Sequence, residues 1–141
     1  MELRALFDDL IRFETILWNT LDARLRAECD TTLGSLNILM VIDATPDCRV
    51  QEVAGALAIT VGGASQSVDR LERAGLCIRT PHPRNRRSSI LRLTAAGDKV
   101  LARAGAAFDR HLAALLGDPL SATQRDQFGA TLKTLRASIS D

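Results

Sequence analysis

Within residues 60–94 the sequence changes from a helical to a strand-like pattern, and this change restricts the fold more than any other feature. The first third of the stretch carries apolar residues spaced by three and four, which predicts one buried face of a helix. These residues are Val61, Ala64, Val68 and Leu71. Thr60 is the expected N-cap of this helix, and Gly75 follows it, where glycine adopts a left-handed stop at the lowest cost.

The rest of the stretch reads as two short strands around a turn. Residues 76–80 and 88–93 have the composition of strands, and residues 81–87 between them form a basic turn bounded by proline. Two short helices are expected upstream, at residues 33–42 and 50–57, and a three-residue turn separates the second from the helix described above. This order of helices, strands and basic turn predicts a winged helix-turn-helix.

The charge of the chain is concentrated in the same region. Residues 70–92 hold seven arginines and one acid, Glu72, which gives this segment a net charge of +6. The whole chain has a formal net charge of +1, so subtraction leaves −5 for the rest. One strongly basic segment on a nearly neutral protein is typical of a surface that binds nucleic-acid phosphates. The simpler alternative is a solvated basic turn without a partner.

The helix face opposite the apolar stripe supplies candidate DNA contacts. It carries Gly62, Gly63, Gln66, Arg70 and Arg73. In a helix that lies in the major groove, Gln66 can hydrogen-bond an adenine, whereas Arg70 or Arg73 can reach a guanine or a phosphate. Ser65 is short and is expected at a phosphate. Gly62 and Gly63 have no side chains that read bases, so they either let the backbone approach a phosphate or mark a degenerate reader.

Long helices are expected at both ends of the chain. Residues 2–28 read as one helix with more apolar surface than a single contact needs. Thr94 is expected to cap a second long helix, and Ser121 is expected to begin the last helix in a capping box with Gln124. The expected fold class is mainly α with a small β-hairpin wing (α+β). The expected organisation is one domain over 1–141, a DNA-binding part at 33–93 and dimerisation helices at 1–28 and 95–141.

Three short motifs occur in order along the second half of the chain. They are Arg70-Leu71-Glu72-Arg73-Ala74-Gly75-Leu76, Arg84-Asn85-Arg86-Arg87 and Leu91-Arg92-Leu93-Thr94-Ala95-Ala96-Gly97. In this order and spacing the chain resembles the MarR family of bacterial winged-helix regulators, whose motifs read Leu-Glu-x-x-Gly-Leu, Asp-x-Arg and Leu-Thr-x-x-Gly. The resemblance implies a wing arginine in the minor groove, matched here by Arg87. Asn85 replaces the aspartate that steadies this arginine, so Arg84 or Arg86 can share the contact.

The resemblance also implies a homodimer joined through the terminal helices, and a small aromatic or phenolic ligand bound between these helices and the DNA-binding part. The candidate ligand-lining residues are Phe13, Leu17, Trp18 and Leu39. The candidate DNA-binding residues are Thr60, Gly62, Gly63, Ser65, Gln66, Arg70, Arg73, Arg84, Asn85, Arg86 and Arg87. The expected function is a sequence-specific transcriptional regulator, most often a repressor, that binds a palindromic operator and is released by its ligand.

Other classes of protein find little support in the sequence. No catalytic constellation, phosphate-binding glycine loop or metal-ligand spacing occurs, so we expect no enzyme, no metal and no cofactor. Cys29, Cys48 and Cys77 are an odd set without a Cys-x-x-Cys pair, which argues against disulfides and structural zinc. No apolar run approaches the ~18 residues that span a membrane, and the first residues do not read as a secretory signal. We therefore expect a cytoplasmic protein that does not bind membranes.

Two alternatives to a ligand-responsive regulator stay open. A redox sensor that acts through a cysteine is disfavoured, because peroxide sensors of the resembled family use an N-terminal cysteine near tyrosines, and this chain has no tyrosine. A protein–protein adaptor that keeps the fold but has lost DNA binding is suggested by Gly62, Gly63 and Asn85. Salt-dependent binding to bulk duplex DNA separates the adaptor from a regulator, because phosphate contacts release counterions.

Overall fold

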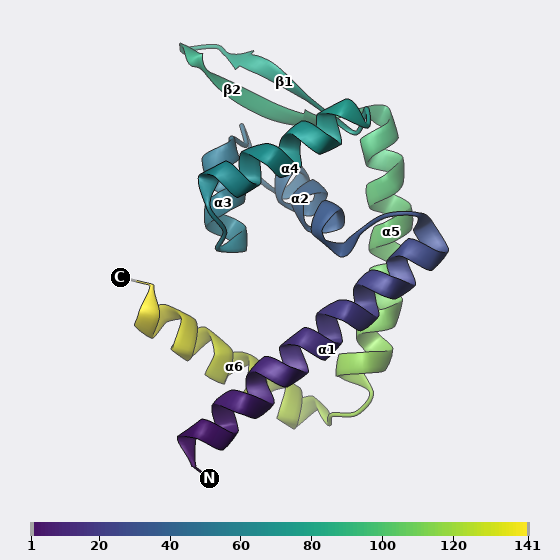
Figure 1. Cartoon of the computed structure of the whole chain (residues 1–141), viewed down its shortest axis with the longest axis vertical. Coiled ribbons are helices and arrows are strands. Elements are labelled where there is room, and N and C mark those ends of the chain that lie inside the picture. The colour runs from purple at the N-terminus through teal and green to yellow at the C-terminus, as the bar shows by residue number, and fades with distance from the viewer. Residues whose placement is uncertain (1, 141) are drawn as a thin grey trace. The chain divides into compact units, whose positions relative to one another are not determined.

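A computed structural model describes residues 2–140, and the side chains of residues 85–87 lie outside that description. The elements are α1 (Leu3–Cys29), α2 (Leu33–Ala44), α3 (Val50–Leu57), α4 (Val61–Arg73), β1 (Cys77–His82), β2 (Asn85–Leu93), α5 (Ala95–Leu112), the π-helical turn η1 (Ala113–Gly117) and α6 (Ala122–Ile139) (Figure 1). The expected class, mainly helical with one β-hairpin in a winged helix-turn-helix, is confirmed. The chain forms two compact units, Met1–Ala107 and Phe108–Asp141, and the single domain over 1–141 stays a prediction.

The helix-turn-helix forms because α2, α3 and α4 bury their apolar faces in one core, beyond which the hairpin extends (Figure 1). The core residues are Ile38, Leu39, Ile42, Cys48, Val53, Ala54, Ala64, Val68, Leu71, Cys77 and Leu91. Three residues join α3 to α4, as expected, and the first of them, Ala58, has a φ of 53°. This left-handed conformation is uncommon for alanine, and no pattern in the sequence signals it.

The predicted burial of Val61 is wrong. Its side chain is 53% exposed, whereas Ala64, Val68 and Leu71 on the same face are buried. Every residue from 58 to 62 is exposed, so only the start of α4 projects from the core. Periodicity identifies the apolar face of a helix, but it does not show how far along the helix a neighbouring element covers that face.

The wing is a two-stranded antiparallel hairpin in which Cys77 lies opposite Leu93 and Pro81 lies opposite Ser89. The register then shifts so that His82 pairs with Asn85. The predicted turn at 81–87 is therefore too long, because β1 continues to residue 82 and β2 begins at residue 85. Proline fits at position 81 of β1. The Arg79 N–H, on the same side of the strand two residues earlier, points away from β2 and donates to Glu72 of α4. An N–H at position 81 is therefore not needed for the strand pairing.

The start of α5 packs against the turn between α4 and β1. The Thr94 N–H donates to the Leu76 carbonyl oxygen at 3.1 Å, and its hydroxyl donates to the Gly75 carbonyl oxygen at 2.6 Å. The Thr94 Oγ1 also accepts the Gly97 N–H at 3.0 Å, which confirms the expected cap of α5. Gly75 has a φ of 77°, which confirms the left-handed residue expected after α4.

The C-terminal part of α1 is fixed to the start of α2. Leu21 and Leu25 are buried, and the Asp22 carboxylate accepts the Leu33 N–H at 2.9 Å and the Arg26 Nε–H at 2.8 Å. These two hydrogen bonds, that of Leu33 first, lower the pKa of Asp22 because they stabilise its charged form. The boundary of α2 is set by Thr32, whose side chain accepts the Ser35 N–H at 3.0 Å.

Both terminal helices also expose large apolar side chains. On α1 the exposed large apolar residues are Leu3, Leu6, Phe7, Leu10, Ile11, Phe13, Ile16 and Trp18. On α6, which begins in the expected Ser121–Gln124 capping box, they are Phe128, Leu135 and Ile139. None of the described helices is long and apolar enough to cross a membrane.

Candidate nucleic-acid interface

The first turn of α4 is held by Thr60, whose side chain accepts the Gly63 N–H at 3.0 Å, as expected for the N-cap. A Cβ at position 63 would lie 3.1 Å from the Thr60 Oγ1, so glycine there leaves room for the cap. A Cβ at Gly62 would meet nothing within 4 Å. Packing therefore does not require glycine at position 62, where the backbone is exposed to solvent.

The expected contact residues of α4 lie on its solvent side. Gln66, Arg70 and Arg73 are exposed, and Ser65 is half-buried. The Arg70 Nη2 donates to the Ser67 Oγ at 3.0 Å, and the Arg73 Nε donates to the carbonyl oxygen of Asp69 at 3.3 Å. Long polar side chains are thus available to a groove, and their separate roles at bases or phosphates stay predictions.

The wing extends this surface. The side chain of Arg84 is exposed at the hairpin tip, and its backbone N–H donates to the His82 Nδ1 at 3.0 Å. The predicted contacts of Asn85, Arg86 and Arg87 fall on side chains outside the described ones, so these contacts stay predictions. The backbone places residue 85 at the start of β2, next to the tip.

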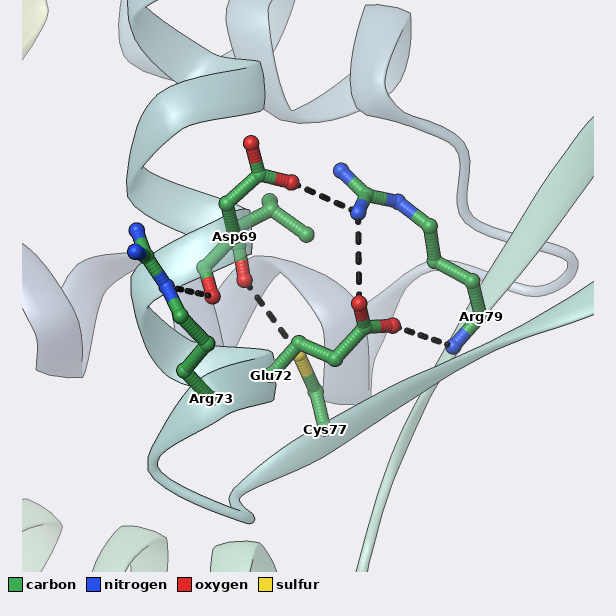
Figure 2. Close-up of polar contacts among 6 residues, drawn as sticks. Asp69, Glu72, Arg73, Cys77 and Arg79 are labelled. Atoms are coloured by element: carbon green, nitrogen blue, oxygen red, sulfur yellow. Dashed lines mark hydrogen bonds and ion pairs between the residues drawn. The ribbon is translucent and has the colours of Figure 1, made fainter.

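The structure describes the side chains of five of the seven arginines in the basic segment, and two of these five have acidic partners. The Arg79 Nη1 lies 2.7 Å from the Asp69 Oδ1 and 3.5 Å from the Glu72 Oε1 (Figure 2), and the Arg92 Nη2 lies 3.8 Å from the Asp47 Oδ1. The net charge of the segment therefore overstates the positive charge that is free to meet DNA. In the part of the chain that the structure describes, Arg70, Arg73 and Arg84 are exposed and make no ion pair.

The ion pairs of Arg79 were not foreseen from the sequence, where this residue counted only as part of a basic run. The first motif includes Glu72, and no motif in the sequence includes Asp69. The available signal was the spacing of three between Asp69 and Glu72, which places both carboxylates on one side of α4.

A cavity of about 780 Å³ lies between α1, α2 and α4. Its lining includes Trp18, Asp22, Arg26, Ser35, Asn37, Ile38, Leu57, Ser67, Arg70 and Leu71. Trp18, one of the four candidate ligand residues, is therefore at this cavity. Leu39 is fully buried in the core, and Phe13 and Leu17 lie on α1 outside the lining. The volume is within the range of small-molecule sites, and the lining mixes apolar with polar groups as such sites do.

The cysteines differ in accessibility. Cys48 and Cys77 are buried. Burial is the main cause that raises the pKa of each thiol, and the nearby charge of Glu52 for Cys48 and of Glu72 for Cys77 raises it further. Cys29 at the end of α1 is half-buried. Among the residues that the structure describes, no three histidine, cysteine or acidic side chains are placed to hold a metal ion.

Comparison with known proteins gives a family match over the DNA-binding part. Residues 31–89 match the model of the MarR family. The HTH-type transcriptional regulator BilQ of Clostridium symbiosum (strain WAL-14163) is 34% identical over 77 residues, which cover 55% of this chain and 54% of that protein. The match thus spans about half the length of this curated relative.

Solved structures of similar fold cover nearly the whole chain. Sco3205, a MarR family transcriptional regulator from Streptomyces coelicolor solved in complex with DNA, has a TM-score of 0.91 and 23% identity, and the match covers 98% of this chain and 88% of that one. The PcaV transcriptional regulator from the same organism, solved with its natural ligand, has a TM-score of 0.79 and 26% identity, with 100% and 95% covered. These three proteins are transcriptional regulators and not enzymes.

Proposed function

We propose that the protein is a transcriptional regulator, which binds double-stranded DNA through α4 and the wing. The basis is the match of residues 31–89 to the MarR family. The observation that carries the proposal is the exposed side of α4, where Gln66, Arg70 and Arg73 lie on a helix whose opposite face is in the core. An α-helix fits the major groove, and these side chains are long enough to reach base edges or phosphates. Sequence-specific repression of a nearby gene is the form of regulation that we infer.

The test of this proposal is a selection from random DNA duplexes with the full chain. We expect enrichment of an approximately palindromic sequence, and affinity that falls as salt rises, because phosphate contacts release counterions. Binding without sequence preference would favour a degenerate reader. The absence of any salt-dependent binding would favour the protein–protein adaptor instead.

The wing part of the proposal rests on Arg87 and is tested by substitution. Arg87→Ala should weaken operator binding by roughly 1–3 kcal/mol, which is the scale of one good groove contact. Asn85→Asp should hold or improve binding if a carboxylate steadies this arginine. Unchanged affinity in a folded Arg87→Ala variant would transfer the contact to Arg84 or Arg86.

A homodimer joined through the terminal helices is the assembly that we infer. The support is the exposed apolar side chains of α1 and, separately, those of α6, which a second copy can cover. In an isologous dimer the same surface serves both copies, so the operator should be palindromic with half-sites about one helical turn apart. Sedimentation at micromolar protein tests this: a monomer that stays unchanged when residues 1–20 are deleted would contradict the dimer.

Release by a small aromatic or phenolic molecule is the mode of regulation that we infer. The support is the cavity beside α4, whose lining includes Trp18, Arg26 and Arg70. Because Arg70 is both a cavity residue and a candidate DNA contact, a molecule bound there would compete for a side chain of the DNA-binding surface. Titration of the operator complex with 4-hydroxybenzoate, and with phenol as the uncharged comparison, tests this route. Failure of either compound to bind the cavity would exclude that compound, whereas binding without release of DNA would contradict the mechanism.

A further inference from the structure

One arginine of the hairpin joins the wing to α4 by three hydrogen bonds. The Arg79 Nη1 donates to the Asp69 Oδ1 at 2.7 Å and to the Glu72 Oε1 at 3.5 Å. The backbone N–H of Arg79 donates to the other Glu72 oxygen, Oε2, at 3.2 Å. Glu72 therefore holds both the main chain and the side chain of the same strand residue, and Figure 2 shows the Arg79 side chain reaching from β1 to both carboxylates. We refer to Asp69, Glu72 and Arg79 together as the Arg79 bridge.

The position of the Arg79 bridge suits it to control the angle of the wing. Only residues 74–76 connect α4 to β1, and the hairpin has two strands. An isolated two-stranded hairpin is marginally stable, so its orientation depends on what holds it to the rest of the fold. The base is held by the buried Cys77 and by the Leu91 N–H, which donates to the Cys48 carbonyl oxygen at 2.7 Å. The bridge acts two residues beyond Cys77 along β1.

The charges of the bridge are unfavourable for DNA binding when they are considered alone. One guanidinium and two carboxylates sum to a net charge of −1. The two carboxylates belong to α4, whose solvent side is otherwise a candidate phosphate-binding surface. Arg79 is also the least exposed of the three side chains, at 25%, and its Nη1 already donates to both acids. An arginine held in this way is poorly placed to serve as a phosphate contact.

We propose that the Arg79 bridge fixes the wing at the angle to α4 that allows both to contact DNA at once, so that Arg79 is a positioning residue and does not itself bind DNA. This inference rests on the proposed function. When the bridge is broken, α4 keeps its own contacts with the major groove. The wing then samples other angles, and its contact with the adjacent groove is lost.

Two substitutions that remove negative charge give the decisive test. The double variant Asp69→Asn/Glu72→Gln nearly preserves shape but makes the chain more positive by two charges. Electrostatic attraction alone predicts tighter DNA binding for this variant. The positioning role predicts binding about tenfold weaker, the scale of one lost groove contact. The two explanations therefore predict changes of opposite sign.

The matched control is Asp47→Asn. This change removes the carboxylate partner of Arg92, whose exposed ion pair at 3.8 Å lies outside the bridge. Position 47 has a φ of 49°, which asparagine tolerates well. We expect Asp47→Asn to bind the selected operator as tightly as wild type, or slightly more tightly.

A second pair of measurements separates positioning from a direct contact. Hydroxyl-radical footprinting should show that the double variant loses minor-groove protection beside each half-site, while methylation interference in the major groove is retained. Adding Arg79→Gln to the double variant should cause little further loss, because members of one interacting group are not additive. A further loss with a salt dependence flatter by about one unit would show that Arg79 binds a phosphate and would overturn the proposal.

The experiment uses the full chain and the operator selected with wild type, with thermal denaturation as the check on folding. The ion pairs of the bridge are only partly buried, and ion pairs in contact with solvent contribute little to stability, so we expect the melting temperature to stay close to that of wild type. If the double variant fails to fold, Asp69→Asn, which keeps both hydrogen bonds of Glu72, should still weaken binding by about threefold. Tighter DNA binding by a folded variant would refute only the positioning role of the bridge. If wild type shows no sequence preference in DNA binding, the proposed function itself is refuted.

Discussion

Replacing Gly97 with alanine should destabilise the protein although alanine is the better helix former. Gly97 is buried in the first turn of α5, where an added Cβ would lie 2.0 Å from the Leu76 carbonyl oxygen and 3.0 Å from its carbonyl carbon. Ordinary contact begins near 3.4 Å, so the two backbone segments must separate by about 1.4 Å. The Thr94 N–H bond to the same oxygen, now 3.1 Å long, would then be too long to persist.

The magnitude follows from three contributions. Forcing an extra carbon into a packed site costs about 1–3 kcal/mol, and losing one hydrogen bond costs about 0.5–1.5 kcal/mol. Alanine recovers up to ~1 kcal/mol of helix propensity. The net loss is about 2 kcal/mol, which corresponds to a fall in melting temperature of roughly 5–10 °C for a chain of this size.

The assay is thermal and urea denaturation of Gly97→Ala beside a matched control, Gly105→Ala. Gly105 lies in the same helix, and a Cβ there would meet nothing within 4 Å. The same chemical change should therefore stabilise the protein at position 105, by up to ~1 kcal/mol. If Gly97→Ala proved as stable as wild type while Gly105→Ala gained stability, the close approach of α5 to Leu76 would not constrain position 97, and the reasoning would be refuted.

Three further outcomes are expected. Asp22→Asn should lower the free energy of unfolding by about 1 kcal/mol near neutral pH. Because the folded-state pKa of Asp22 is below 3.8, this difference from wild type should persist above pH 3.8 and vanish as pH falls through the folded-state pKa. Urea denaturation across pH measures it. Gln66→Ala should change base preference at one or two positions of each half-site in a selection from random duplexes, and selection of the wild-type operator would mean that α4 docks differently. Alkylation of the native protein should modify Cys29 first, with Cys48 and Cys77 protected until denaturant is added, and rapid native-state labelling at position 48 or 77 would contradict their burial.

Much of the candidate site follows from local sequence. The cap at Thr60, the inward face of Ala64, Val68 and Leu71, and the left-handed Gly75 depend on residues within about one turn of each other, so their spacing in the chain is enough to predict them. The outward side of α4 follows for the same reason, because a helix that buries one face must expose the other.

The features that the sequence left undecided depend on residues that meet only in the folded chain. The number of arginines gives the charge of a segment but not the partner of each side chain. In the sequence, Arg79 is therefore part of the basic surface, whereas in the folded chain it pairs with two acids of α4. The glycine of the Leu-Thr-x-x-Gly motif is required at position 97 because a backbone carbonyl 21 residues earlier lies against it. The spacing of Val61 predicts a buried side chain, but this side chain is 53% exposed at the start of α4. Local spacing thus determined which faces of the helices and strands are apolar or polar. Tertiary packing decided which of these faces are covered and which charges are paired. The reason is that burial and ion pairing each involve two surfaces, whereas a periodic pattern describes only one.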